Sequence, residues 1–217
     1  MIPCTVAPEE LARRVAEVRR RIEAAGGDPA AVTLVGVTKG FDGSAPAAAV
    51  AAGLADLGES YAQEAVAKAE VAPEGVRWHW VGRLQRNKVR QVAPFVHLWH
   101  SVDRARLGAE IARRAPGAAV LAQVNTSGED GQGGCPPDGA AALVADLRAE
   151  GLEVRGLMTI AARGDAAAGC FRTLRGLADD LGLPERSMGM SADLAAAVAE
   201  GATMVRVGTA LFGARER

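Results

Sequence analysis

The chain has few cysteines, almost no net charge and no long apolar run, and each shortage argues against a class of protein. Its three cysteines, Cys4, Cys135 and Cys170, form no CxxC pair and are odd in number, so we expect no disulfide framework and a reducing, cytoplasmic location. The net charge of −1 argues against general binding to nucleic acid or to an anionic membrane. No apolar stretch is long enough to cross a bilayer, and the N-terminus lacks the hydrophobic region of a signal peptide.

Strand-like and helix-like segments alternate from end to end, which predicts one domain over residues 1–217. With 217 residues, of which 49% are apolar, the chain is long enough for one sizeable core and short for two. Strands are expected at residues 31–38, 55–58, 77–82, 98–102, 119–125, 154–160, 187–190 and 203–207. Helices are expected at residues 9–25, 46–52, 61–70, 86–92, 104–114, 137–150, 166–181 and 192–200.

The number of these units favours an α/β fold built as a single TIM (β/α)8 barrel, which requires about eight strand–helix pairs. A doubly wound open sheet is the alternative, but no G-x-G-x-x-G motif follows the first strand. The longest loop, at residues 127–136, is glycine-rich and acidic. Because it follows a strand, we expect it on the C-terminal face of the barrel, where binding loops lie.

Lys39 is the most informative single residue, because it directly follows the apolar run VTLVGVT at residues 32–38. A charge beside buried apolar residues is costly unless it has a role. A partly desolvated lysine has a lowered pKa and becomes nucleophilic toward an aldehyde. The alternative is a solvated loop lysine, which is the commoner situation in proteins.

Two turns near the end of the chain have the composition of a phosphate site. SMGMS at residues 187–191 precedes a predicted helix, and Gly208-Thr209 follows the last predicted strand. The loops after strands seven and eight form the usual phosphate site of a TIM barrel. Ser191 is also expected to be the N-cap of the helix at residues 192–200. An amine and a phosphate site in one pocket suggest pyridoxal 5'-phosphate (PLP) as the cofactor.

Arg206 lies between Val205 and Val207, so it is expected on the opposite face of the last strand, inside the barrel. An arginine that faces the pyridine nitrogen of PLP would keep this nitrogen unprotonated and make the ring a weaker electron sink. The alternative is an ion pair with an acidic residue at the rim of the barrel.

Taken together, these segments resemble the PLP homeostasis protein family, whose members are similar to the N-terminal barrel of alanine racemase. The resemblance covers nearly the whole chain and rests on several motifs in one order. These are LVGVTK (34–39), GESYAQE (58–64), WHWVGRLQRNK (78–88), GLM (156–158), SMGMS (187–191) and VRVGTALFG (205–213).

The resemblance implies that Lys39 carries PLP as a Schiff base, that Ser191, Gly208 and Thr209 hold the phosphate, and that Arg206 faces the ring nitrogen. It also implies that Met158, at the end of a strand, lines the pocket. The chain departs from the family at Ser60, where an asparagine is usual, at Gly40-Phe41-Asp42 after the lysine, and at Arg83, where proline is common. Ser60 is nevertheless counted among the cofactor-binding residues.

The function implied by the resemblance is that of a PLP carrier, buffer or regulator rather than an enzyme. Racemisation needs a base on each face of the substrate, and in alanine racemase the opposing tyrosine comes from a C-terminal domain that we expect this chain to lack. Tyr61 is the single tyrosine, so the alternative is a weak PLP-dependent amino-acid racemase that uses Tyr61 or a water. The expected partners are PLP and related B6 vitamers, and PLP-dependent apoenzymes; a monomer is expected.

Two other interpretations are weaker. The segment 78–90 combines aromatic and basic residues and could bind nucleic acid, although a strand followed by a solvated basic helix explains it better. His79, His97 and His100 could suggest a metal site. Because residues 97 and 100 would point to opposite faces of a strand, we expect none. The segment 128–131 resembles an incomplete calcium loop, and we expect it to be a flexible rim.

Overall fold

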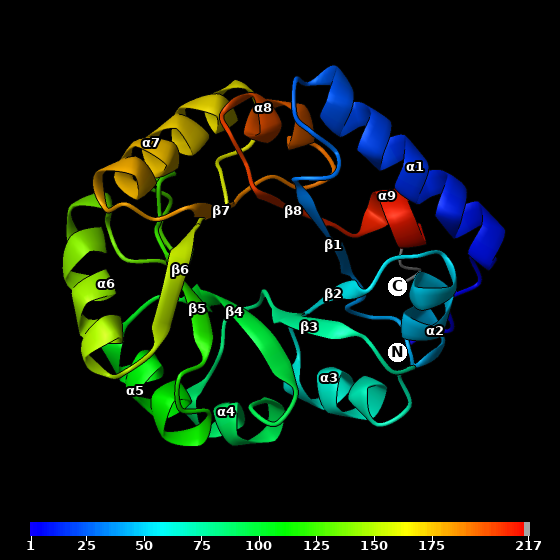
Figure 1. Ribbon diagram of the computed structural model, residues 1–217, viewed down its shortest axis with the longest axis horizontal. Coiled ribbons are helices and arrows are strands. Elements are labelled where there is room, and N and C mark those ends of the chain that lie inside the picture. The colour runs from blue at the N-terminus through cyan, green and yellow to red at the C-terminus, as the bar shows by residue number, and fades with distance from the viewer. Residues whose placement is uncertain (215–217) are drawn as a thin grey trace.

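The computed structural model describes residues 1–214 and shows eight parallel strands closed into a barrel, with helices around it (Figure 1). Each strand pairs with the next, and β8 pairs with β1, where Leu34 lies opposite Val205. The strands are β1 (Thr33–Val37), β2 (Asp56–Glu59), β3 (Arg77–Trp80), β4 (Val96–Val102), β5 (Ala119–Gln123), β6 (Glu153–Met158), β7 (Glu185–Ser187) and β8 (Met204–Val207). The predicted TIM barrel is confirmed, and the open sheet is wrong.

The helices alternate with the strands and cover the outside of the barrel. They are α1 (Pro8–Ala24), α2 (Ser44–Ala51), α3 (Ala62–Ala69), α4 (Arg86–Val92), α5 (Ala105–Arg114), α6 (Ala140–Ala149), α7 (Ala167–Asp180), α8 (Leu194–Ala199) and α9 (Thr209–Phe212). Short 3-10 turns, η1 (Pro137–Gly139) and η2 (Gly164–Ala166), precede α6 and α7. None of the helices formed by residues 1–214 is long and apolar enough to cross a membrane.

The first helix, α1, shows why these segments fold locally as they do. Proline is at its start, with acidic residues in the first turn and Arg21 in the last, which suits the helix dipole. Its buried residues recur every three or four positions and form one apolar stripe: Leu11, Val15, Val18 and Ile22. This stripe packs α1 beside α8 and α9, so that the two ends of the barrel sequence meet (Figure 1).

The apolar residues form two separate layers, one between the strands and the helices and one inside the barrel. The outer layer is the larger and includes Leu57, Trp99, Val120, Leu157 and Val205. The inner cluster contains Leu98, Ala119, Leu121, Met158 and Met204. Alternate residues of each strand face the two layers, as period-2 geometry requires.

The predicted boundaries hold to within a few residues, and the largest differences fall near the C-terminus. β7 ends at Ser187, whereas the strand was expected at residues 187–190, and α8 begins at Leu194 rather than at residue 192. The prediction of one domain over residues 1–217 stays a prediction, since residues 215–217 lie outside the described part of the chain.

Candidate functional site

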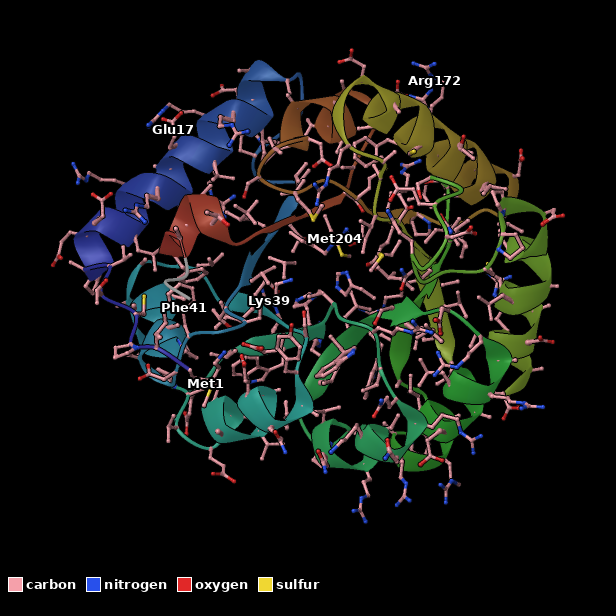
Figure 2. The ribbon with its side chains drawn as sticks, turned by 180° about the vertical axis from the view of Figure 1, so that it is seen from behind. Met1, Glu17, Lys39, Phe41, Arg172 and Met204 are labelled. Carbon is pink, nitrogen blue, oxygen red and sulfur yellow. The ribbon has the colours of Figure 1, made fainter. Side chains whose placement is uncertain are left out.

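A cavity of about 310 Å³ opens at the C-terminal ends of the strands. This inner chamber is within the size range of small-molecule sites. Figure 2 shows Lys39 near the barrel axis and Phe41 farther out, toward the helices. The lining residues are Val37, Lys39, Phe41, Ser60, Val81, Ile160, Met190, Ser191, Ala192, Arg206, Gly208, Thr209 and Gly213.

Lys39 lies two residues past the end of β1, on a tight turn. The N–H of Phe41 donates to the carbonyl of Thr38 at 3.1 Å, which closes the turn over residues 38–41. Gly40 has φ +87°, a left-handed conformation that favours glycine. The turn therefore directs Lys39 to the barrel mouth, where its half-buried side chain lines the chamber.

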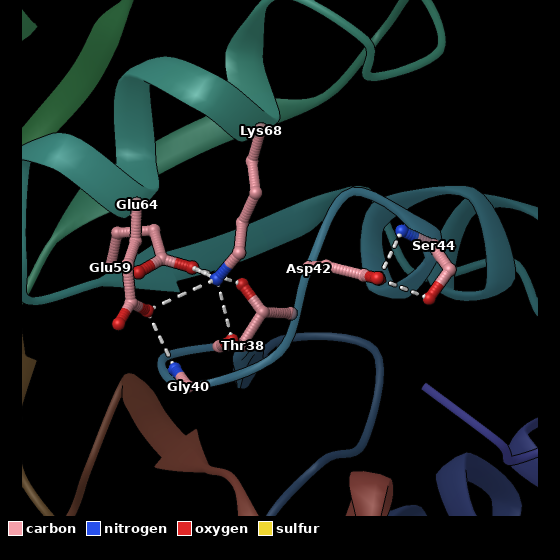
Figure 3. A network of polar contacts seen from close by, with 7 residues as sticks. All are labelled: Thr38, Gly40, Asp42, Ser44, Glu59, Glu64 and Lys68. Atoms are coloured by element: carbon pink, nitrogen blue, oxygen red, sulfur yellow. Dashed lines mark hydrogen bonds and ion pairs between the residues drawn. The ribbon is translucent and has the colours of Figure 1, made fainter. Parts of the chain in front are cut away.

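A buried ion-pair cluster of Glu59, Glu64 and Lys68 holds this turn from the side of α3, and we call it the lysine-turn anchor (Figure 3). Lys68 of α3 is fully buried, and its Nζ donates to the carbonyl of Thr38 at 2.7 Å and to Glu59 Oε1 at 2.5 Å. Glu64 accepts the N–H of Gly40 at 2.6 Å and lies 3.5 Å from Lys68. The residues on both sides of Lys39 are thus bonded to α3 and β2.

Glu59 carries the electrostatic cost of this anchor. Burial raises the pKa of Glu59, while the charge and hydrogen bond of Lys68 and the Thr38 hydroxyl act in the opposite direction. Its Oε2 is buried and has no hydrogen-bond partner among residues 1–214. This anchor was not predicted from the sequence, where its signal is Glu64 and Lys68, spaced i,i+4 on a helix directly after the GES segment.

The two predicted phosphate turns both border the inner chamber, and Gly208 follows β8, which is the neighbour of the strand that precedes Lys39. Ser191, Gly208 and Thr209 all line the cavity. Gly208 precedes α9, whose first N–H groups have no partner within the helix. A Cβ on Gly208 would lie 3.3 Å from the carbonyl oxygen of Val37, so any larger residue would crowd the floor here.

The expected N-cap role of Ser191 is wrong. The N-cap of α8 is Asp193, and no side chain caps this helix. Instead, the Asp193 carboxylate accepts the N–H of Met190 at 2.5 Å, which folds residues 191–193 into a turn before the helix begins. The hydroxyl of Ser191 therefore makes no capping hydrogen bond. The backbone carbonyl of Ser191 accepts a hydrogen bond from Arg21 of α1 at 2.9 Å.

Arg206 is buried in the barrel interior and reaches the chamber from β8. Its NH1 donates to Ser187 Oγ at 2.6 Å, and its NH2 donates to the carbonyl of Thr159 at 2.8 Å. Burial lowers the pKa of Arg206 to about 10, partly offset by Asp193, so the guanidinium is still a cation at neutral pH. Among the described residues, Arg206 has no acidic partner within 4 Å, contrary to the alternative of an ion pair at the rim of the barrel.

Two further predicted site residues have different surroundings. Ser60 lines the chamber at the end of β2, packed so closely against Gly82 that a Cβ there would lie 2.5 Å from the serine Cβ. Met158 is fully buried in the inner apolar cluster and is absent from the lining among residues 1–214. Ile160, two residues farther along and past the end of β6, lines the chamber instead.

A larger outer chamber of about 1170 Å³ continues from the inner one and shares Lys39, Ser60, Val81 and Ile160 with it. Its other walls include Tyr61 and the basic residues Arg83, Lys88 and Arg104. Gly131, Gln132 and Gly133 from the long loop also line it, as expected for a loop on the C-terminal face. The side chain of Tyr61 is 57% exposed, so it stands at the mouth and not against the inner chamber.

The nucleic-acid interpretation loses its aromatic component in the structure. Trp78 and Trp80 are buried, and Trp78 packs edge-on against Phe95, so neither ring is placed to stack on a base.

The alternation expected for residues 97 and 100 is wrong. A register shift between β3 and β4 inserts His97 as an extra residue, and its ring then lies 5.9 Å from that of His79. His100 contacts the same ring at 5.0 Å from inside the barrel. Among the side chains of residues 1–214, no group of three or more His, Cys, Asp or Glu is arranged to hold a metal ion.

Comparison with known proteins gives the same assignment over the full barrel. The family model for the alanine racemase N-terminal domain matches residues 6–216. A pyridoxal phosphate homeostasis protein of Pseudomonas aeruginosa is 44% identical, covering 96% of this chain and 95% of the relative, and one of Escherichia coli K12 is 39% identical, covering 95% and 97%. The structure of PipY of Synechococcus elongatus PCC7942 with PLP bound is 35% identical with a TM-score of 0.80, covering 94% of this chain and 100% of PipY. The chain therefore belongs to the pyridoxal phosphate homeostasis protein family, within the group that shares the alanine racemase N-terminal domain.

Proposed function

We propose that this protein binds PLP at Lys39 and acts in PLP homeostasis as a carrier, buffer or regulator of the cofactor. The observation that carries the proposal is the inner chamber, which is lined by one lysine, two phosphate-type turns and one buried arginine. The PLP-bound structure of PipY, a relative with the same fold, supports it. When bound, PLP supplies an aldehyde with which the amine of Lys39 condenses, with loss of one water.

Different residues of the chamber suit different parts of PLP. Hydroxyls of Ser191 and Thr209, and the N–H groups at the start of α9, suit a phosphate. Gly208 leaves room for the close approach of that phosphate. Arg206 is a cation that only donates, so it would hold the pyridine nitrogen as an acceptor without a proton. The ring is then a poor electron sink, which favours holding the cofactor over transforming an amino acid.

The alternative function is weak PLP-dependent racemisation of a small amino acid. One observation favours it: Tyr61 lines the outer chamber, which adjoins Lys39. Its exposed position at the mouth makes it a poor second base, because a base must reach the proton it removes. Measuring D-alanine formation by the purified protein and by Tyr61→Phe separates the two functions. Robust turnover that Tyr61→Phe abolishes would contradict the carrier proposal.

Delivery of PLP would require contact with a receiving enzyme, and the basic surface beside the outer chamber is suited to an acidic partner. A groove between α4 and α5 is lined by Arg86, Lys88, Arg90, Arg113 and Arg114, which outnumber its one acidic residue, Glu110, the partner of Arg113 and Arg114. Lys88 also lines the outer chamber. We propose PLP-dependent apoenzymes as partners, other B6 vitamers as further ligands, and a monomer in a cytoplasmic setting. Replacing the basic residues of this groove with neutral ones should slow the transfer of PLP to an apoenzyme without weakening PLP binding.

The test of PLP binding uses the small number of lysines in this chain. Lys39, Lys68 and Lys88 are the only three in the sequence, and Lys68 is fully buried in the anchor. After incubation with PLP, borohydride reduction and peptide mass spectrometry should place the label on Lys39. An absorbance band at roughly 420 nm should appear in the wild type and in Lys88→Arg, and be lost in Lys39→Ala. Label spread over Lys88 and the N-terminus would show adventitious modification and contradict the proposal.

A further inference from the structure

A continuous series of hydrogen bonds runs through the barrel from the start of β2 to the inner chamber. Asp56 contacts His79 Nε2 at 2.9 Å, and His79 Nδ1 contacts His100 Nε2 at 2.8 Å. His100 Nδ1 contacts Ser187 Oγ at 2.8 Å, and Ser187 Oγ accepts from Arg206 at 2.6 Å. We call these five residues the interior chain. It links five strands, β2, β3, β4, β7 and β8, and ends on the arginine that lines the chamber.

The two ends of the interior chain determine its direction. An arginine can only donate and a carboxylate can only accept. The Asp56 carboxylate accepts hydrogen bonds from both His79 and Arg77, so His79 carries its hydrogen on Nε2. A neutral His79 then accepts at Nδ1 the hydrogen bond that His100 donates from Nε2. His100 in turn accepts at Nδ1 from the hydroxyl of Ser187. The oxygen of Ser187 accepts from Arg206. Every member is satisfied when both imidazoles are neutral Nε2–H tautomers.

The surroundings make this direction matter. The interior chain is surrounded inside the barrel by apolar side chains that exclude water, namely Leu98, Leu121, Met158 and Met204. His100 and Ser187 are both fully buried. A polar group left without a partner in such a place costs far more than one at the surface.

We propose that Asp56, His79, His100 and Ser187 are positioning residues that hold the Arg206 guanidinium at one orientation in the chamber. Two of the five N–H donors of Arg206 go to Ser187 and Thr159, which ties it on two sides and directs the rest of its fork toward a ligand. The effect on a bound pyridine nitrogen rests on the proposed function, whereas the direction of the chain does not. Asp56 would thus influence the cofactor site from the opposite end of the barrel.

The first test is nitrogen-15 NMR of the histidine rings in the cofactor-free protein at neutral pH. Both His79 and His100 should be neutral Nε2–H tautomers. Asp56→Asn, whose amide can donate as well as accept, should allow Nδ1–H forms at His79 and His100. The matched variant Arg77→Gln removes the other partner of Asp56 and should leave both tautomers unchanged. An Nδ1–H form or an imidazolium at either histidine in the wild type would overturn the proposal, and so would identical spectra for the wild type and Asp56→Asn.

The second test compares two serine-to-alanine changes by PLP affinity and by the absorbance spectrum of bound PLP. Ser187→Ala removes the link to Arg206, while Ser101→Ala removes a buried hydroxyl on β4 that bonds only the carbonyl of Gly82 among the described residues. Ser187→Ala should raise the Kd roughly tenfold, the cost of one hydrogen bond to a charged group, and shift the spectrum. Ser101→Ala should do neither. Equal Kd values and spectra for the two variants would sink the proposal, whereas a wild type that fails to bind PLP would refute the proposed function and leave the tautomer test standing.

Discussion

Two buried polar groups of this barrel sit back to back on strand β2, and they work in different ways. The lysine-turn anchor lies outside the barrel, where Lys68 contacts Glu59 and Glu64 directly. The interior chain lies inside, where two neutral imidazoles and a serine separate the anion Asp56 from the cation Arg206. Opposite charges in contact brace a turn, whereas a series of neutral groups between charges can carry orientation over a distance.

Their electrostatics differ accordingly. In the anchor, burial raises the pKa of Glu59 against the pull of Lys68. In the interior chain, burial opposes ionisation of Asp56, but hydrogen bonds from His79 and Arg77 outweigh it and lower its pKa to about 2. Burial, with the nearby cation Arg206 acting in the same direction, holds the pKa of His100 well below 6.5. The anchor should therefore govern stability, and the interior chain should govern the shape and charge of the site.

The sharpest way to break the anchor is Lys68→Met. Removing the cation leaves Glu59 buried without a counter-charge, which should cost about 3–5 kcal/mol of unfolding free energy. Urea denaturation followed by circular dichroism measures this loss. Lys88→Met, on a less buried part of α4, should change stability by about 0.5 kcal/mol or less. A loss below about 1 kcal/mol for Lys68→Met would contradict the role of the anchor as a structural brace.

The link between the anchor and Lys39 can be tested with two glycines of like conformation. Gly40 and Gly53 have φ values of +87° and +77°, so alanine at either position should cost about 1–2 kcal/mol of stability. Gly40→Ala should in addition weaken PLP binding, because Gly40 forms part of the turn that carries Lys39 and donates to Glu64. Gly53→Ala, which follows α2, should not. The two variants are compared by denaturation and by PLP titration, and equal PLP affinities would show that the turn tolerates the strain.

The smallest expected effect is the pH dependence contributed by the interior chain. His100 has a depressed pKa when folded and takes up a proton near its ordinary value of 6.5 when unfolded. The stability it contributes is therefore present above pH 6.5 and is lost as the pH falls, by about 1 kcal/mol between pH 6.5 and 5.5. Urea midpoints at the two pH values should differ more for the wild type than for His100→Gln. The same pH dependence in both proteins would mean that His100 is accessible to protons in the folded state.

Much of the candidate site was predictable because it follows from chain order. Lys39 after the first strand, and Gly208-Thr209 after the last, had to meet once the barrel closed, since β1 and β8 are neighbours in every such barrel. Arg206 was placed inside the barrel by simple alternation between two valines. The failures came where one contact shifted a boundary: Asp193 displaced the start of α8, and a bulge moved His97.

The order of the eight units, the outward and inward faces of the strands, and the side chains that reach the C-terminal rim follow from the amino-acid sequence, because they depend on local period and on connectivity. The support that Lys68 gives to the Lys39 turn and the connection from Asp56 to Arg206 arise only in the folded barrel. Each of these arrangements joins residues from separate elements, within buried surroundings where every donor needs an acceptor. Such pairing depends on distances that exist only after the barrel has closed.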